Sequence, residues 1–183
     1  FHQVTRQEGN NTLEDYASNA RGMNVIVPTW FNVVSSDGTS TSLASKDYVD
    51  KAHDMGLKVW AMVENVSTQE SIKNLNTKTL MSSTSTRKKL IEKLMNEADT
   101  YGFDGFNLDF ESLTSEAGPH YVQFIREMSV ACRNKGLVLS VDNYVPSSYT
   151  AFYNRKEQGI VADYVIVMGY DEHYAGGEPG SVA

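Results

Sequence analysis

Four glycines each separate an amphipathic, helix-like segment from an apolar, strand-like segment. They are Gly22, Gly56, Gly102 and Gly136. Glycine often follows the last turn of a helix because it adopts the left-handed backbone conformation without steric cost. The helix-like segments are long enough to connect parallel strands, which need a crossover rather than a tight turn. This alternation predicts a single α/β domain over residues 1–183.

The predicted strands are 1–5, 24–31, 58–63, a segment within 101–111, 137–145 and 163–170. The predicted helices are 11–21, 45–55, 85–101 and 121–134, with 149–158 partly helical, and 32–42, 64–79 and 112–118 are predicted loops. Six such strands fit either an open doubly wound sheet or part of a (β/α)8 barrel. An open sheet buries apolar residues on both faces of its central strands. A strand with an acidic face fits a barrel better, because the inner side of its carboxyl end lines the mouth.

The segment 101–111, YGFDGFNLDFE, carries such a face. Reading it with period 2 places Phe106, Leu108 and Phe110 on one side and Asn107, Asp109 and Glu111 on the other. The Cα atoms of Asp109 and Glu111 are then about 7 Å apart. Two carboxylates this close disfavour double ionisation, so the pKa of one should rise, as a general acid near neutral pH requires. A solvated strand face shows the same alternation, so the pattern by itself leaves both interpretations open.

The overall charge narrows the possible partners. The formal net charge of −7 argues against nucleic acid and anionic membrane surfaces, because both require basic patches. No apolar run approaches the length of a membrane span. The four histidines show no metal-ligand spacing, and the single cysteine, Cys132, cannot form an internal disulfide. We therefore expect neither a metal nor a cofactor.

Two motifs together resemble glycoside hydrolase family 18. Residues 104–111, DGFNLDFE, resemble the family's D-x-x-D-x-D-x-E signature, with Asn107 in place of the second aspartate. Residues 168–171, MGYD, resemble its M-x-Y-D motif on strand six, and one helix, one strand and one connector separate the two motifs. The stretches PTWF, SVDNYVP and MGYDEHYAG look most like the bacterial subgroup that cuts peptidoglycan, including spore-cortex N-acetylglucosaminidases.

The resemblance implies a (β/α)8 TIM barrel that is truncated here to about strands 1–6. Such barrels typically need about 250 residues, so strands seven and eight are expected to lie outside this chain. The remainder of the barrel, from a C-terminal segment or a partner, would then be needed to close the sheet. The resemblance also implies a location outside the cell, in the cell envelope or in the spore.

As implied by the resemblance, the chain is a glycosidase that cleaves β-linked N-acetylglucosamine polymers, with peptidoglycan favoured over chitin. The family mechanism is substrate-assisted and retaining, so the 2-acetamido group of the sugar is the nucleophile. Glu111 would be the acid and base, and Asp109 would orient the acetamido N–H. Tyr170 would hold the acetamido oxygen, and Asp171 would contact the sugar nearby.

Other residues receive weaker predictions. The candidate substrate contacts at strand ends are Trp30, Asn65, Asn107, Asn143 and Tyr144. Alternation along 137–145 places Tyr144 and Asn143 on opposite faces, so only some of these residues can line the site. Asp104 and Met168 are expected to be structural.

Two departures from the family pattern favour an alternative function. Asn107 is an amide and cannot share a proton with Asp109. The inward serine that often ends strand three in chitinases is also missing, because the run here is Met62-Val63-Glu64-Asn65. The alternative is a carbohydrate-binding member of the same fold without turnover. A parallel α/β domain of unrelated function is a third possibility.

Overall fold

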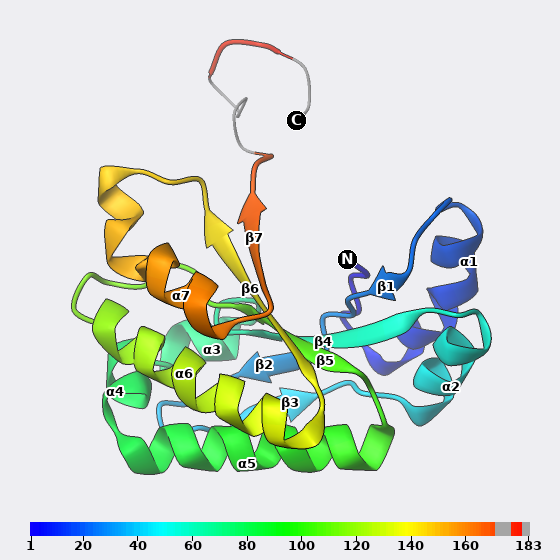
Figure 1. Ribbon diagram of the computed structural model, residues 1–183, viewed down its shortest axis with the longest axis horizontal. Helices are drawn as coiled ribbons and strands as arrows, with labels where there is room; N and C mark the ends of the chain where they lie inside the picture. The colour runs from blue at the N-terminus through cyan, green and yellow to red at the C-terminus, as the bar shows by residue number, and fades with distance from the viewer. Residues whose placement is uncertain (171–176, 181–183) are drawn as a thin grey trace.

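The computed structural model describes residues 1–170 and 177–180, and within them a curved sheet forms the centre of the molecule (Figure 1). Its strands are β1 Val25–Ile26, β2 Phe31–Val33, β3 Ser40–Ser42, β4 Lys58–Glu64, β5 Gly105–Asp109, β6 Val138–Tyr144 and β7 Tyr164–Met168. The strand order is β3-β2-β4-β5-β6-β7, and β1 pairs with the beginning of β4. All neighbours are parallel except β2 and β3.

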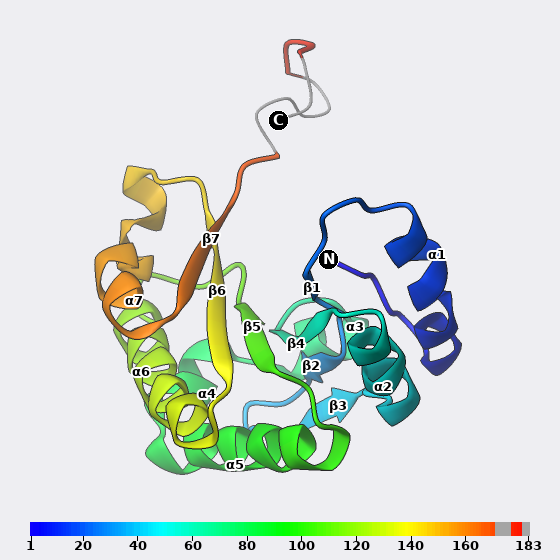
Figure 2. The ribbon, with the colours of Figure 1, turned by 45° about the vertical axis from the view of Figure 1, so that its right-hand side comes forward.

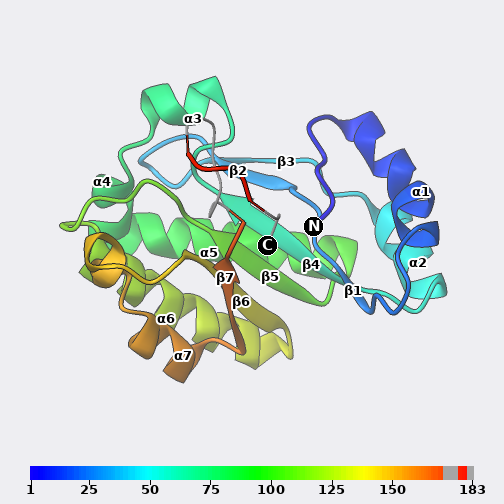
Figure 3. The ribbon, with the colours of Figure 1, turned by 90° about the horizontal axis from the view of Figure 1, so that it is seen from above.

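The helices lie along the outside of this sheet. They are the 3-10 helices η1 Gln7–Thr12 and η2 Ser148–Tyr153, and the α-helices α1 Leu13–Ser18, α2 Lys46–Asp54, α3 Gln69–Asn74, α4 Thr77–Ser82, α5 Thr84–Tyr101, α6 Gly118–Lys135 and α7 Arg155–Val161. Figure 2 shows α6 and α7 on one side of β6 and β7. The view from above in Figure 3 shows helices around the outside of the strands. Parallel strands inside and helices outside are the arrangement of a (β/α)8 barrel.

Glycine ends the two longest helices as predicted. Gly102 follows α5 with φ 76°, and Gly136 follows α6 with φ 68°. Both values lie in the left-handed region that residues with a Cβ rarely adopt. Each glycine turns the chain from the outer layer back towards the next strand.

The core lies between the outer face of the sheet and the helices. Phe106 and Leu108 of β5 have no exposed surface, and Phe110 is 1% exposed. The ring centroid of Phe110 lies 5.3 Å from that of Tyr121 and 5.7 Å from that of Phe124, both on α6. Burying each such phenylalanine contributes about 1.5–3 kcal/mol to folding. The apolar side of the segment 101–111 is therefore fixed against the helices, which turns its polar side inward.

An aromatic contact shows how strongly the sheet curves. The ring centroids of Trp60 on β4 and Tyr164 on β7 are 5.1 Å apart, although β5 and β6 lie between these strands in the sheet. Trp60 crosses over Gly105 of β5, where an added Cβ would lie 2.9 Å from Trp60 Cδ1 and 2.6 Å from the Val138 carbonyl oxygen. Glycine at position 105 therefore allows the amino-terminal end of the concave face to close.

The first two predicted strands are shorter than expected. Residues 1–5 contribute only a single bridge between His2 and Pro28. The predicted strand 24–31 is divided into β1 and the start of β2, because Pro28 has no N–H to donate to a ladder. Both pieces pair in parallel with β4.

Two predicted loops contain regular structure. The stretch 32–42 contains the β2–β3 hairpin, and 64–79 contains α3 and most of the first turn of α4. These helices have six residues each and no continuous apolar stripe, so their pattern did not indicate a helix. They begin at side-chain caps: the Thr68 hydroxyl accepts from Ser71 N, and the Asn76 side chain accepts from Thr79 N. None of the helices in the described part of the chain combines the length and the hydrophobicity that a membrane span requires.

Candidate active site

Carboxylates meet at the carboxyl ends of three adjacent strands. The register pairs Glu64 of β4 with Asp109 of β5. It also pairs Leu108 with Val141, which places Asp142 of β6 beside Asp109. Paired residues of neighbouring strands project to the same face. Glu64, Asp109 and Asp142 therefore point together into the concave side of the sheet.

Glu111 lies just beyond β5 and is held by Tyr144. The Tyr144 hydroxyl donates a 2.8 Å hydrogen bond to Glu111 Oε2 and accepts one of 3.0 Å from the Ser112 backbone N–H. Ser112 has φ 55°, a left-handed conformation that is uncommon for a residue with a Cβ. This turn directs the chain away from the sheet immediately after Glu111, so that the carboxylate ends at the mouth.

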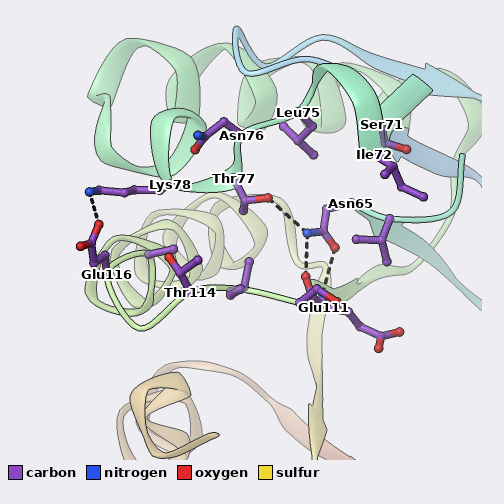
Figure 4. Close-up of a pocket in the computed structure, with 14 residues that line it drawn as sticks. Asn65, Ser71, Ile72, Leu75, Asn76, Thr77, Lys78, Glu111, Thr114 and Glu116 are labelled. Atoms are coloured by element: carbon purple, nitrogen blue, oxygen red, sulfur yellow. Dashed lines mark hydrogen bonds and ion pairs between the residues drawn. The ribbon is translucent and has the colours of Figure 1, made fainter. Parts of the chain in front are cut away.

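Asn65, at the end of β4, fixes the backbone of Glu111. Asn65 Nδ2 donates to the Glu111 carbonyl oxygen, and Asn65 Oδ1 accepts from the Glu111 N–H, each at 2.9 Å. Nδ2 also lies 3.2 Å from the Thr77 hydroxyl, and the residue is 3% exposed. Figure 4 shows Asn65 between Thr77 and Glu111. The side chain is therefore used within the protein, and the predicted contact of Asn65 with sugar stays a prediction.

A groove of about 720 Å³ opens beside Glu111, between the α3–α4 region and the loop after Glu111. Its apolar lining includes Ile72, Leu75 and Leu113. Lys78 and Glu116 form an ion pair at its edge, also visible in Figure 4. The groove therefore provides a mixed apolar and polar surface next to the proposed acid.

Asn107 lies beneath the carboxylates and has no exposed surface. Its Nδ2 donates to Ser140 Oγ at 3.0 Å and to Asp142 Oδ1 at 2.9 Å. Within the described residues, Asn107 Oδ1 and Asp109 Oδ1 are buried without a hydrogen-bond partner. The amide of Asn107 therefore belongs to the floor of the site, and its role as a substrate contact stays a prediction.

The surroundings raise the pKa of two aspartates. Burial first, and then the charges of Glu111, Asp142 and Glu64, together raise the pKa of Asp109 to about 7. Burial also raises the pKa of Asp142 to about 6, against a lowering effect of the Asn107 hydrogen bond. The pKa of Glu64 is raised by burial too. The expected raised pKa in the Asp109–Glu111 pair thus falls on Asp109.

The last strand brings the second motif to the same end of the sheet. Met168 ends β7, is partly buried, and pairs with Tyr144 of β6. Tyr170 follows two residues later and is 59% exposed. Asp171 lies outside the described residues. The roles assigned to Tyr170 and Asp171 stay predictions.

Two other predicted contacts are directed away from the mouth. Trp30 is fully buried: its indole N–H donates to Asn10 Oδ1 at 2.8 Å, and its ring packs edge-on against Tyr48. Asn143 is 1% exposed and donates to Gln158 of α7 at 2.6 Å, on the helix side of β6. Both side chains are packed within the protein here, and their substrate contacts stay predictions.

Asp104 lies at the opposite end of β5 from the mouth. Its carboxylate accepts from the Val59 backbone N–H and from Lys58 Nζ, each at 2.9 Å, and Oδ2 lies 2.7 Å from His53 Nε2. These contacts join β5 to β4 and α2, an arrangement consistent with the structural role expected of it.

Sequence reasoning did not assign Glu64 to the site. Alternation along 137–145 predicts Ser140, Asp142 and Tyr144 on one face at the mouth, although only Tyr144 is a predicted substrate contact. Across the described part of the chain, no group of three or more histidine, cysteine or acidic residues is arranged to hold a metal ion.

A curved parallel sheet surrounded by helices, with acidic residues at the carboxyl ends of its strands, is the arrangement of a barrel-type enzyme site and is compatible with glycoside hydrolysis. The sequence model of "Glycosyl hydrolases family 18" matches residues 4–180, and the chain belongs to this family.

Among curated proteins, the chain is 31% identical over 136 residues to the "Uncharacterized glycosylase YvbX" of Bacillus subtilis (strain 168), covering 69% of this chain and 39% of that protein. It is 27% identical over 110 residues to the "Cortical fragment-lytic enzyme" of the same organism, covering 57% of this chain and 26% of that protein. The chain thus spans well under half the length of these two relatives.

Solved structures confirm the fold. A chitinase from Chromobacterium violaceum ATCC 12472 matches with a TM-score of 0.78 and 24% identity, covering 98% of this chain and 58% of that one. The Bacillus cereus spore cortex-lytic enzyme SleL matches with a TM-score of 0.78 and 19% identity, covering 99% of this chain and 42% of that one. The predicted (β/α)8 architecture is confirmed.

Proposed function

We propose that this chain carries the acid and base of a glycosidase that cleaves β-linked polymers of 2-acetamido sugars, with peptidoglycan as the favoured substrate. The observation that carries the proposal is the placement of Glu111: Asn65 fixes its backbone, Tyr144 holds its carboxylate, and Asp109 lies on the same strand face. A solvated strand face would not need these three constraints.

In the proposed reaction, Glu111 donates its proton to the glycosidic oxygen as the bond from that oxygen to C1 breaks. The carbonyl oxygen of the sugar's 2-acetamido group bonds to C1 and forms an oxazolinium ion. Asp109 accepts a hydrogen bond from the acetamido N–H and stabilises the positive charge. Glu111 then takes a proton from water, the water oxygen bonds to C1, and the oxazolinium ring opens. Configuration at C1 is retained.

The groove beside Glu111 supports an extended substrate. Its apolar side chains can pack against sugar faces, while Lys78 and Glu116 at the edge offer polar contacts. The preference for peptidoglycan, and a location at the spore or cell wall, draw support from the cortex-lytic relatives. Chitin is the second substrate considered, since a chitinase shares the fold.

The proposal is tested with purified protein, peptidoglycan and chitin oligosaccharides, by measuring new reducing ends and the released products. We expect cleavage by the wild type and a loss of at least about 100-fold in Glu111→Gln, since the variant has no proton to donate. Glu92→Gln is the matched control, because Glu92 is an exposed α5 residue paired with Lys88. Equal products from the wild type and Glu111→Gln, or no products from either, would overturn the proposal.

A second experiment addresses the nucleophile. De-N-acetylated chitin oligosaccharides have no acetamido carbonyl, so the substrate-assisted reaction predicts that they bind but are not cleaved. Cleavage of both substrates at similar rates would exclude this mechanism.

A second candidate function is carbohydrate binding without turnover. The observation that favours it is Asn107, whose buried amide lies beneath Asp109. This amide cannot ionise. This candidate predicts saturable heat of binding to chitin oligosaccharides with no reducing ends formed. The calorimetric and product measurements on the same samples separate the two functions.

A further inference from the structure

A buried hydrogen-bonded unit joins β5 to β6 directly beneath the proposed acetamido site. It consists of Asn107, Ser140 and Asp142, and each residue is at most 3% exposed. Asn107 Nδ2 uses its two hydrogens on Ser140 Oγ and Asp142 Oδ1. Ser140 Oγ in turn donates to the Phe106 carbonyl oxygen at 3.3 Å. The carboxyl group of Asp142 therefore has a fixed orientation beside Asp109.

Asp142 and Asp109 share a low-dielectric environment that contains other acids. The titratable side chains that act on the two are Glu64 from β4, Glu111 after β5, and the hydroxyls of Tyr121 on α6 and Tyr153 on η2. Two aspartates at neighbouring positions of adjacent strands cannot both ionise readily in such surroundings. Within the described residues, Asp109 Oδ1 has no hydrogen-bond partner, which leaves it available for a proton or a ligand.

We propose that Asp142 is a positioning residue that shares one proton with Asp109, and that this proton passes to Asp142 when Asp109 accepts the acetamido N–H of the substrate. The transfer of the proton to Asp142 on substrate binding rests on the proposed function. The sharing of one proton is a property of the protein without substrate.

The transfer is balanced in atoms and charge. The O–H bond of Asp109 breaks, an O–H bond forms on Asp142, and the pair keeps a net charge of −1 throughout. Asp142 Oδ1 continues to accept the Asn107 hydrogen bond in both states, because the proton can reside on Oδ2. Asp109 becomes a carboxylate as positive charge develops on the oxazolinium ring. Burial raises the pKa of both aspartates, to about 7 for Asp109 and about 6 for Asp142, so either carboxyl group can carry the proton.

The first test is a carbon-13 NMR titration of the aspartate carboxyl groups in the purified protein without substrate. We expect Asp109 and Asp142 to titrate as a coupled pair, with one proton retained near pH 6. In Asp142→Asn, the titration of Asp109 should move to lower pH by about one unit, since a like charge is removed. Asp99→Asn is the control, because Asp99 lies on α5 and pairs with Lys135 at the surface.

The wild-type data alone can overturn the inference, whether or not the variant folds. They would do so if Asp109 and Asp142 titrated independently, each near the ordinary pKa of about 3.9. An unchanged Asp109 titration in folded Asp142→Asn would also overturn it. Neither result depends on glycan cleavage.

The second test measures the pH dependence of kcat/KM on chitin oligosaccharides. Asp142→Asn should lower kcat by roughly 10-fold to 100-fold and move the limb of the profile that belongs to Asp109 to lower pH. Asp142→Glu retains a carboxyl group and should recover part of the loss. A reduced kcat with an unshifted profile and no recovery in Asp142→Glu would assign Asp142 a purely structural role and contradict the inference. If the NMR titration shifts as expected but neither the wild type nor the Asp142 variants cleave the glycan, the shared proton stands and only the proposed function is rejected.

Discussion

The Tyr144 hydroxyl donates to Glu111 Oε2 at 2.8 Å and accepts from the N–H of Ser112, the residue that follows Glu111. One side chain of β6 thus holds both the carboxylate and the backbone turn of the proposed acid. We predict that Tyr144→Phe lowers kcat by up to about 10-fold, because a typical hydrogen bond contributes about 0.5–1.5 kcal/mol. Tyr149→Phe is the control, since Tyr149 is 88% exposed. Unchanged kcat in Tyr144→Phe would remove this hydrogen bond from the mechanism.

Asn65 should matter for both stability and activity. Asn65→Ala leaves the N–H and carbonyl of Glu111 without their partners, so we expect a loss of about 1–3 kcal/mol in the free energy of unfolding. The kcat should fall by a larger factor than the affinity for substrate, because the Glu111 backbone is no longer fixed. Urea denaturation and steady-state kinetics check the two effects. Asn96→Ala on α5 controls for the substitution itself, and equal stability in both variants would contradict the prediction.

Asp109 should destabilise the folded protein at high pH. Its pKa is raised to about 7 in the folded state, against about 3.9 in an unfolded chain. The folded protein therefore binds more protons than the unfolded one between these values, and its stability falls as pH rises through this window. Asp109→Asn removes the cost of ionisation and should be more stable than wild type by about 1–3 kcal/mol at pH 8, with little difference at pH 4. Thermal unfolding at both pH values tests this, and a pH-independent difference would refute it.

Gly105→Ala should destabilise the sheet by about 1–3 kcal/mol, as overpacking commonly does. The added Cβ would meet the Val138 carbonyl oxygen at 2.6 Å and Trp60 Cδ1 at 2.9 Å. Gly159→Ala on α7 is the matched control, because a Cβ there meets no atom within 4 Å, and alanine should stabilise a helix by up to about 1 kcal/mol. Denaturation midpoints that shift in opposite directions from the wild-type value in the two variants would support this account. Equal shifts would reject it.

The sequence predicted the parallel architecture and the polar face of β5 because these depend on local periodicity. Phe106 and Leu108 face the helices, so Asp109 must face inward. The role of Asn65 was not predictable, since its partner Glu111 lies 46 positions away and meets it only when β4 and β5 pair. Local alternation could have excluded Asn143, which lies on the opposite face from Tyr144.

Trp30 shows a different limit of sequence reasoning. A tryptophan near the end of a strand is compatible with a sugar platform or with the core. The break at Pro28 decides between them, because it turns the chain so that the indole reaches Asn10 and Tyr48. Likewise, α3 and α4 depend on their caps at Thr68 and Asn76 rather than on an apolar stripe.

The Trp60–Tyr164 contact also gives the molecule an intrinsic optical reporter. The chain has two tryptophans, and the other, Trp30, is fully buried in the outer core. In a Trp30→Phe background, tyrosine-to-tryptophan energy transfer and the emission of Trp60 would respond to the separation of β4 and β7. The curvature of the sheet could then be followed in real time, without a label, as a glycan or a further protein segment closes against the concave side.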